Sequence, residues 1–322
     1  MTAPHHPDAG QVRPGRRRPR SGRGRAALVA VLLGLLALLA DAAVLSDRVG
    51  QVDVALAADD SDGRTWVLVG LDSRAALPAG ADPADFGTAD AVPGSRADVV
   101  LVVHQTDAGA TVLSVPRDLL VDDGSGPGRL ALSWLDGPRA TVGALCRLGI
   151  PADHLVTVDL AGFAAVVDAA GGLDVDVPEP VRDRPAGLLV ERAGRQHVDG
   201  ATALALVRSR HPEHLVDDAW VPAPVDPDGR ATAAGTVLSA MVAQLQRSLV
   251  SPWRLQSVAW AASGALATDP GTSVADLAGL ARTDVGAVAV LPAADPVAGT
   301  LPRLPTAQTA AAVAAAGLSC DG

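Results

Sequence analysis

Arginine and aspartate recur side by side where apolar runs of the chain meet polar sequence. The pairs are Asp72 with Arg74, Arg96 with Asp98, and Arg117 with Asp118, and two further arginines, Arg208 and Arg210, end a predicted helix. Guanidinium groups match phosphate oxygens bidentately, and Mg²⁺ binds through one or two carboxylates together with substrate phosphates. The pattern therefore predicts a diphosphate site with Mg²⁺ or a similar divalent cation. Separate surface ion pairs, which contribute little, remain the alternative.

Three predicted strands position these pairs. Thr65–Leu71, Ala97–His104 and Ala110–Val115 are Val-rich runs of strand length, and Gln105–Gly109 reads as the turn of a hairpin between the last two. Strand ends are where α/β sheets place their ligand sites. Several guanidiniums that converge there repel one another unless a polyanion lies between them. We therefore expect all the arginines at one cleft mouth.

The rest of the chain alternates between strand and helix patterns. Strands are expected at 155–160, 173–177 and 286–291, and helices at 139–148, 161–170, 199–208, 230–249, 253–264, 273–282 and 306–316. The Pro- and Asp-rich segment His211–Asp228 is expected to be a loop. This alternation predicts one α/β domain with a mixed central β-sheet between helical layers.

Composition excludes several classes of function. Apolar residues make up 48% of the 322, which rules out disorder over most of the chain. All 26 basic residues are arginine, and after Leu45 there are 19 of them against 34 acidic residues. A domain this acidic does not bind nucleic acid through bulk charge. The common hydrolase, metalloprotease and nucleotide-binding motifs are absent.

The N-terminal segment predicts export to the membrane. Residues 1–25 form a tail with seven arginines, residues 26–45 an apolar anchor, residues 46–64 a polar linker, and residues 65–322 the domain. Arginines before the apolar run hold that side in the cytoplasm. We expect a single-pass membrane protein with its C-terminal domain outside, while a signal peptide cleaved near Ala42 remains open. Cys146 and Cys320 form either one disulfide or two unrelated buried thiols.

Several of these segments together resemble the LytR-CpsA-Psr family. The resemblance rests on 65–74, 95–103, 114–119, 149–153, GFAAVVDAAGGLDVDV at 162–177, GRQHVDGATALALVRSR at 194–210, and Asp228–Arg230. It implies a membrane-anchored phosphotransferase that moves a glycopolymer from a polyprenyl-diphosphate carrier to peptidoglycan. Mg²⁺ and an arginine cluster would hold the diphosphate.

The resemblance also implies roles for single residues. Asp72 and Asp98 would bind the metal, and Asp98 or Asp118 would take the proton of the acceptor hydroxyl, with Arg117 beside them in catalysis. The diphosphate would be bound by Arg74, Arg96, Arg117, Arg208, Arg210 and Arg230.

Two departures leave a second hypothesis open. The family's K-I-N-x-A segment is here Arg129 to Ser133, with Ala131 in place of Asn, and Arg230 is followed by Ala231 to Gly235 where the family continues to Arg and Gln-Gln. The losses favour a non-catalytic, membrane-anchored protein that binds polyprenyl diphosphate or serves as a cell-wall accessory factor. The retained aspartates and arginines favour the enzyme.

Overall fold

The computed structural model describes residues 21–56, 63–79, 88, 90, 92–122, 126–224, 226, 228–296 and 301–320. The chain divides into two compact units, Met1–Val44 and Leu45–Gly322. In the first, the described residues belong to one helix, α1 (Ser21–Arg48), whose last four residues are part of the second unit. Most of the predicted tail, 1–25, lies outside the described residues.

Helix α1 carries the apolar run. Ala27–Arg48 has the length and composition of a membrane span, with a mean hydropathy of 2.7 in its most apolar window. Its 22 residues reach about 33 Å at 1.5 Å per residue, against the roughly 30 Å of a bilayer core. The helix is therefore compatible with a single-pass anchor.

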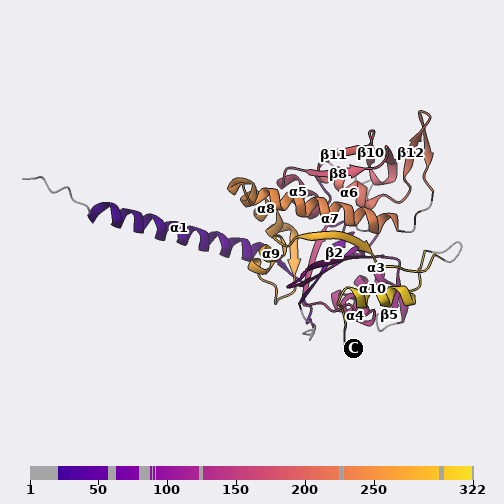
Figure 1. Ribbon diagram of the computed structural model, residues 1–322, viewed down its shortest axis with the longest axis horizontal. Coiled ribbons are helices and arrows are strands. Elements are labelled where there is room, and N and C mark those ends of the chain that lie inside the picture. Colours follow the sequence, from indigo (N-terminus) through magenta and orange to yellow (C-terminus); the bar gives the residue numbers. More distant parts are fainter. Residues whose placement is uncertain are drawn as a thin grey trace, which may run out of the picture. The chain divides into compact units, whose positions relative to one another are not determined.

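A seven-stranded mixed sheet forms the centre of the second unit (Figure 1). Its strands in spatial order are β1 (Gly50–Gln51), β14 (Leu266–Thr268), β7 (His154–Asp159), β2 (Arg64–Leu71), β3 (Ala97–Thr106), β4 (Gly109–Val115) and β15 (Val285–Val290). Strands β2, β3 and β4 pair antiparallel, whereas β2 with β7 and β4 with β15 are parallel. The predicted hairpin and the mixed sheet are confirmed.

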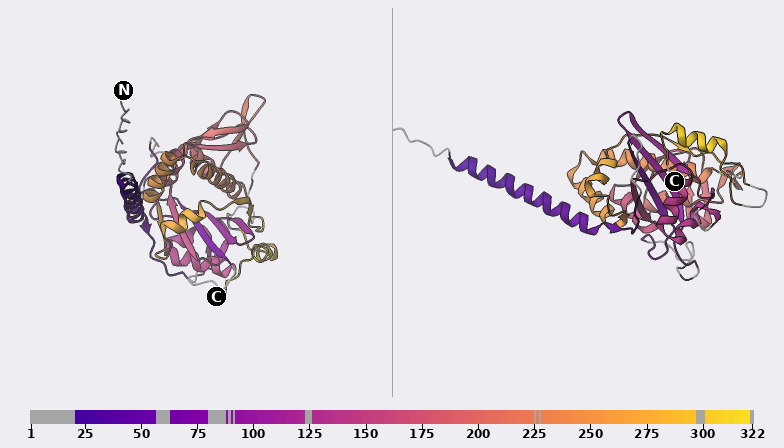
Figure 2. Two further views of the ribbon diagram at one scale, coloured as in Figure 1. Left: turned by 60° about the vertical axis from the view of Figure 1, so that its left-hand side comes forward. Right: turned by 90° about the horizontal axis from the view of Figure 1, so that it is seen from below.

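Helices cover both faces of this sheet (Figures 1 and 2). They are α3 (Leu130–Ser133), α4 (Pro138–Arg147), α5 (Leu160–Ala169), α6 (Gly200–Arg208), α7 (Gly229–Ser248), α8 (Pro252–Ala265), α9 (Val274–Leu280) and α10 (Ala307–Ala315), with 3-10 turns η1 (Trp134–Asp136) and η2 (Arg184–Ala186). Successive side chains of β3 point to opposite faces of the sheet, so this strand contributes to a hydrophobic core on each face. On one face, Val100 and Val102 pack with Leu145 of α4 and Val313 of α10. On the other, Val103 packs with Leu238 of α7.

Of the short strands outside the main sheet, only the one at 173–177 was predicted. Strands β10 (Leu188–Val190), β9 (Val181–Asp183), β12 (Glu213–Val216) and β13 (Ala219–Pro222) form a second sheet, and β11 (Gly194–Val198) with β8 (Leu173–Val177) and β5 (Leu120–Asp122) with β6 (Pro127–Arg129) form two pairs. The expectation of a loop over 211–228 is therefore wrong in part. A hairpin turns there at Asp217 and Asp218, both in the left-handed region with φ of 48° and 60°.

Two further findings concern the ends of the second unit. The segment 46–64, expected as a linker, contains the last turn of α1 and β1, and β1 pairs in parallel with β14 at the edge of the main sheet. Cys146 of α4 and Cys320 are joined by a disulfide, which decides between the two alternatives for these cysteines.

Candidate functional site

Adjacent ends of β2 and β3 bring Asp72 and Asp98 together. The backbone N–H groups of both residues donate to the carbonyl oxygen of Arg96, at 3.1 and 3.0 Å. The Arg96 N–H in turn donates to Asp72 Oδ1 at 2.6 Å. The other oxygen of Asp72 lies 3.3 Å from Arg74 Nη1 and 3.6 Å from Arg96 Nη1. The backbone of the two strands thus fixes two carboxylates and two guanidiniums at one place.

Asp98 connects this group to the rest of the site. Its Oδ1 accepts from Nη1 of Arg117, which follows β4, and its Oδ2 lies 3.1 Å from Nη2 of Arg210, which follows α6. The Arg117 side chain is only 10% exposed. Because each oxygen of Asp98 meets a guanidinium from a different element, this carboxylate joins the sheet to the helical layer.

Asp118 gathers three guanidiniums. Its Oδ1 lies 3.0 Å from Arg129 Nη1 and 3.6 Å from Arg117 Nε, and its Oδ2 lies 3.0 Å from Arg230 Nη2. Arg129 stands where the family has lysine, and the structure places its positive charge in the cluster. Ala131 is fully buried and brings no polar group.

Asp183 is a residue that sequence reasoning missed. This buried aspartate ends β9, and its Oδ2 accepts hydrogen bonds from Ser209 Oγ and from the N–H groups of Arg210 and His211, at 2.8, 2.6 and 2.7 Å. Burial by itself raises the pKa of Asp183, but these hydrogen bonds outweigh it and the pKa is lowered. Asp183 therefore fixes the backbone after α6, where Arg208 and Arg210 must turn toward the site. No motif signals this role, because the partners lie 26 to 28 residues away.

Helix α7 supplies Arg230 in its first turn. Burial, together with the neighbouring charges of Arg117 and Arg210, lowers the pKa of Arg230 to about 10. The group remains charged at neutral pH, in an environment that already holds positive charge. Asp228, two residues before Arg230 in the chain, forms an ion pair with Arg303.

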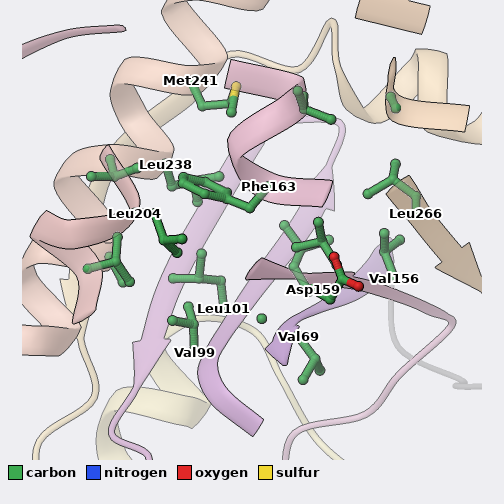
Figure 3. Close-up of a pocket in the computed structure, with 18 of the residues that line it drawn as sticks. Val69, Val99, Leu101, Val156, Asp159, Phe163, Leu204, Leu238, Met241 and Leu266 are labelled. Atoms are coloured by element: carbon green, nitrogen blue, oxygen red, sulfur yellow. The ribbon is translucent and has the colours of Figure 1, made fainter. Parts of the chain in front are cut away.

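An apolar cavity of about 660 Å³ adjoins the cluster, between the sheet and helices α5 to α9 (Figure 3). Figure 3 shows Val99 and Leu101 of β3 facing Phe163 of α5 and Leu204 of α6 across it. One set of lining residues is polar and coincides with the cluster: Asp72, Arg74, Asp98, Asp183, Arg208, Arg210, His211 and Arg230. Asp159, Ser248 and Ser263 are the other polar lining residues, so the cavity is largely apolar with its arginines at one ionic end.

The predicted site residues fall in one region. Asp72, Arg74, Asp98, Arg208, Arg210 and Arg230 line the large cavity, and Arg117 and Asp118 line a small adjoining pocket that shares Asp98 and Arg230. Arg96 reaches the group through Asp72. In the described part of the chain no three His, Cys, Asp or Glu residues form a ready metal site.

The family model of the LytR_cpsA_psr family matches residues 42–287, which is more than half of the chain. The chain belongs to the LytR-CpsA-Psr family. A solved structure described as a LytR-Csp2A-Psr enzyme from Actinomyces oris is 36% identical, with a TM-score of 0.70, over 84% of this chain and 97% of that one. The fold class expected from the sequence is thereby confirmed.

Two similar proteins carry names that bear on function. The probable cell wall biosynthesis protein LcpB of Corynebacterium glutamicum is 33% identical over 62% of this chain and 53% of its own length. TagV of Bacillus subtilis, a polyisoprenyl-teichoic acid–peptidoglycan teichoic acid transferase, is 32% identical over 36% of this chain and 32% of its own length. The chain thus spans about half or less of the length of these relatives. Homologues in the family are cell-wall glycopolymer transferases.

Proposed function

We propose that this protein transfers a glycopolymer from a polyprenyl-diphosphate carrier to peptidoglycan or another cell-wall acceptor. The observation that carries the proposal is the apolar cavity with an ionic end. An amphiphile with a long hydrocarbon tail and an anionic head is divided in the same way, into an apolar part and a charged part. The tail would fill the space between the sheet and α5 to α9, which leaves the diphosphate at the Arg–Asp cluster.

The charge of the cluster favours an anion. Seven guanidiniums meet four carboxylates there: Arg74, Arg96, Arg117, Arg129, Arg208, Arg210 and Arg230 against Asp72, Asp98, Asp118 and Asp183. The carboxylates leave a surplus of positive charge; the pKa of Arg230 is lowered mainly by burial and further by the charges of Arg117 and Arg210. A diphosphate would relieve this repulsion, and charge-assisted hydrogen bonds from guanidinium forks are the strong class of such contacts.

Asp72 and Asp98 are the residues that would hold Mg²⁺. Two aspartates whose backbone N–H groups donate to the same carbonyl oxygen present two carboxylates at one place, which fits a cation that completes its shell with diphosphate oxygens and water, as Mg²⁺ commonly does. When bound, the cation would neutralise charge that develops on the leaving phosphate. Both carboxylates now hold guanidiniums, which would turn to the diphosphate as it enters.

Asp98 is the better placed of the two candidate bases. It lines both the cavity and the small pocket, whereas Asp118 lines only the small pocket and holds three guanidiniums. In the transfer, the acceptor hydroxyl oxygen forms a bond to the phosphorus that carries the glycan and its proton passes to Asp98. The bond from that phosphorus to the bridging oxygen breaks, and polyprenyl phosphate leaves. Asp118 would act as a positioning residue for Arg117, Arg129 and Arg230.

Release of polyprenyl phosphate tests the proposal. The full chain is incubated with a short-chain polyprenyl-diphosphate oligosaccharide, an acceptor glycan and Mg²⁺, and the lipid product is measured by mass spectrometry. Loss of a general base typically costs about 10²–10⁴-fold in rate. We therefore expect Asp98→Asn to lose at least about 10²-fold in turnover, and exposed Asp176→Asn to behave as wild type. No turnover in the wild-type protein would overturn the proposal.

A second candidate function rests on Ala131. Because this buried alanine stands where the family resemblance predicts asparagine, its side chain offers no polar group there. The protein would then bind polyprenyl diphosphate without transfer, as an accessory factor of cell-wall assembly. Saturable binding of the lipid with no release of polyprenyl phosphate is the outcome that this candidate predicts.

A further inference from the structure

An exposed apolar corner stands where α7 passes into α8. Val250 and Trp253 are 87% and 88% exposed, and Leu249, Leu255 and Trp260 are also exposed. We call Val250, Trp253 and Trp260 the tryptophan corner. Large apolar side chains with this exposure, gathered on one surface, mark a place of contact with another apolar body.

Helix α8 is apolar on two sides. Leu255, Val258, Ala259 and Ala262 line the large cavity, and α8 packs on α5 and α7 (Figure 1). Trp253 and Trp260 are seven residues apart and so lie on a common face of the helix, and neither lines the cavity. A single wall, one helix thick, therefore separates the tryptophan corner from the cavity.

Charge distinguishes this region from the rest of the domain. The stretch 229–268 contains no aspartate or glutamate, and its charged residues are Arg230, Arg247 and Arg254. The chain after Leu45 otherwise carries a large excess of acidic residues. Absence of acidic groups removes repulsion from an anionic lipid surface, and arginine with tryptophan is the composition of interfacial helices.

The end of the apolar helix α1 is fixed to the same place. Arg48, the last residue of the candidate membrane span, lies over the Trp260 ring with its Cζ 3.8 Å from the ring centroid. Its Nε donates to Ser263 Oγ at 3.1 Å and its Nη2 to the Trp260 carbonyl at 3.3 Å. If Ala27–Arg48 crosses a bilayer, the surface of that bilayer lies where Arg48 and Trp260 meet.

We propose that the tryptophan corner rests in the lipid–water interface of the membrane that α1 crosses. The proposal builds on the membrane anchor and the lipid substrate of the proposed function. Trp is enriched at this depth because its ring is apolar and its N–H is polar. Leu249 and Leu255 are exposed beside the tryptophan corner and also line the cavity. A lipid tail could therefore pass along them from the bilayer into the cavity without crossing water.

A depth measurement on the full chain tests the position of the corner. Both native cysteines form the disulfide, so Val250→Cys introduces one labelling site, and Leu189→Cys on β10, 53% exposed, is the matched control. Each variant is spin-labelled in nanodiscs. The label at 250 should collide several-fold more with oxygen than with a water-soluble nickel chelate, relative to the label at 189. Equal nickel accessibility at both sites, or a label shielded from both agents by a second copy, would overturn the proposal.

A kinetic comparison separates this proposal from the proposed function. Val250→Gln with Trp253→Gln should slow turnover several-fold on a long-chain carrier in vesicles and leave turnover of a short-chain carrier in detergent unchanged. Equal rates for variant and wild type in vesicles would contradict the inference. If the wild-type protein turns over neither carrier, the proposed function fails, while the depth measurement still decides where the corner lies.

Discussion

Arg210 Nη2 lies 3.1 Å from Asp98 Oδ2, and 112 residues of chain separate the two. Asp183 makes this contact feasible, because it binds the N–H groups of Arg210 and His211 just beyond the end of α6. The ion pair is half-exposed on the arginine side, so it contributes little stability by itself. Its consequence is positional, since it holds the arginine after α6 against the aspartate of β3, and both residues line the cavity.

Arg117→Ala should weaken binding of a polyprenyl diphosphate. A charge-assisted contact in a partly desolvated site is worth roughly 1.5–3 kcal/mol, which corresponds to about a ten- to hundredfold loss of affinity. Arg117→Lys should recover part of this loss, because an ammonium keeps the charge without the fork. Titration with a fluorescent short-chain lipid measures the effect, with exposed Arg139→Ala as control. Wild-type affinity in Arg117→Ala would show that Arg117 forms a structural ion pair and does not bind the diphosphate.

Asp183→Ala should lower both stability and activity. The substitution leaves three donors around a buried position without their acceptor, at a cost of roughly 3 kcal/mol in the free energy of unfolding. Urea unfolding followed by circular dichroism measures the loss, and Asp176→Ala on the exposed side of β8 is the control. If both variants unfold at the same urea concentration, Asp183 has no such role.

Acid should destabilise the fold in part through Asp174. Its hydrogen bonds with His197 and Arg195 lower its pKa from 3.8 to about 2. A carboxyl whose pKa is lower in the folded state stabilises above its unfolded pKa, and this contribution is lost as the pH falls from 3.8 to about 2. In Asp174→Asn the thermal midpoint should therefore fall less steeply over this window than in wild type. An unchanged slope in Asp174→Asn would contradict the assignment.

Reduction of the disulfide should destabilise the second unit. The bond between Cys146 and Cys320 closes a loop of 174 residues, and loss of a native disulfide typically costs about 2–5 kcal/mol. Cys146→Ser with Cys320→Ser should lower the urea midpoint, and dithiothreitol should lower that of the wild type to the same value. A double variant that resists urea like oxidised wild type would show that the bond is dispensable.

A reporter enzyme active only outside the cytoplasm should work when fused after Gly322. Seven arginines before the apolar run favour a cytoplasmic N-terminal side, so we expect the second unit outside. A fusion active only in the cytoplasm would reverse the topology. A soluble mature protein that begins near Ala42 or Ala43 would replace the anchor by a cleaved signal.

Sequence periodicity predicted the elements that carry strong local signals. Val-rich β3 and β4 with the short turn between them, and α6 with the Asp199 cap that accepts from the Thr202 N–H, are examples. The β12–β13 hairpin was missed because its turn is Asp-Asp, with neither residue a glycine, and its strands have four residues each. Such strands are at the lower limit of the window in which alternation can be detected.

The candidate site could be predicted only in part, and the reason is related. Arg–Asp pairs next to strand ends are visible in the sequence, whereas contacts across the fold leave no local trace. Asp183 with Ser209 and Asp228 with Arg303 are of the second kind, 26 and 75 residues apart. The cavity is likewise a property of packing, since periodicity reveals an apolar face but not the space between two such faces.

The order of strands in the main sheet has a consequence for export. Strands β7, β2, β3 and β4 lie together in the middle, and the last two to be synthesised, β14 and β15, flank them on either side. During synthesis from the N-terminus, two edges of the sheet therefore stay unpaired until β14 is complete at residue 268, and the edge at β4 stays unpaired until β15 is complete at residue 290. Unpaired edges invite association with other chains. If the second unit is exported, translocation is the stage at which it most needs a chaperone, and truncations before β14 should aggregate.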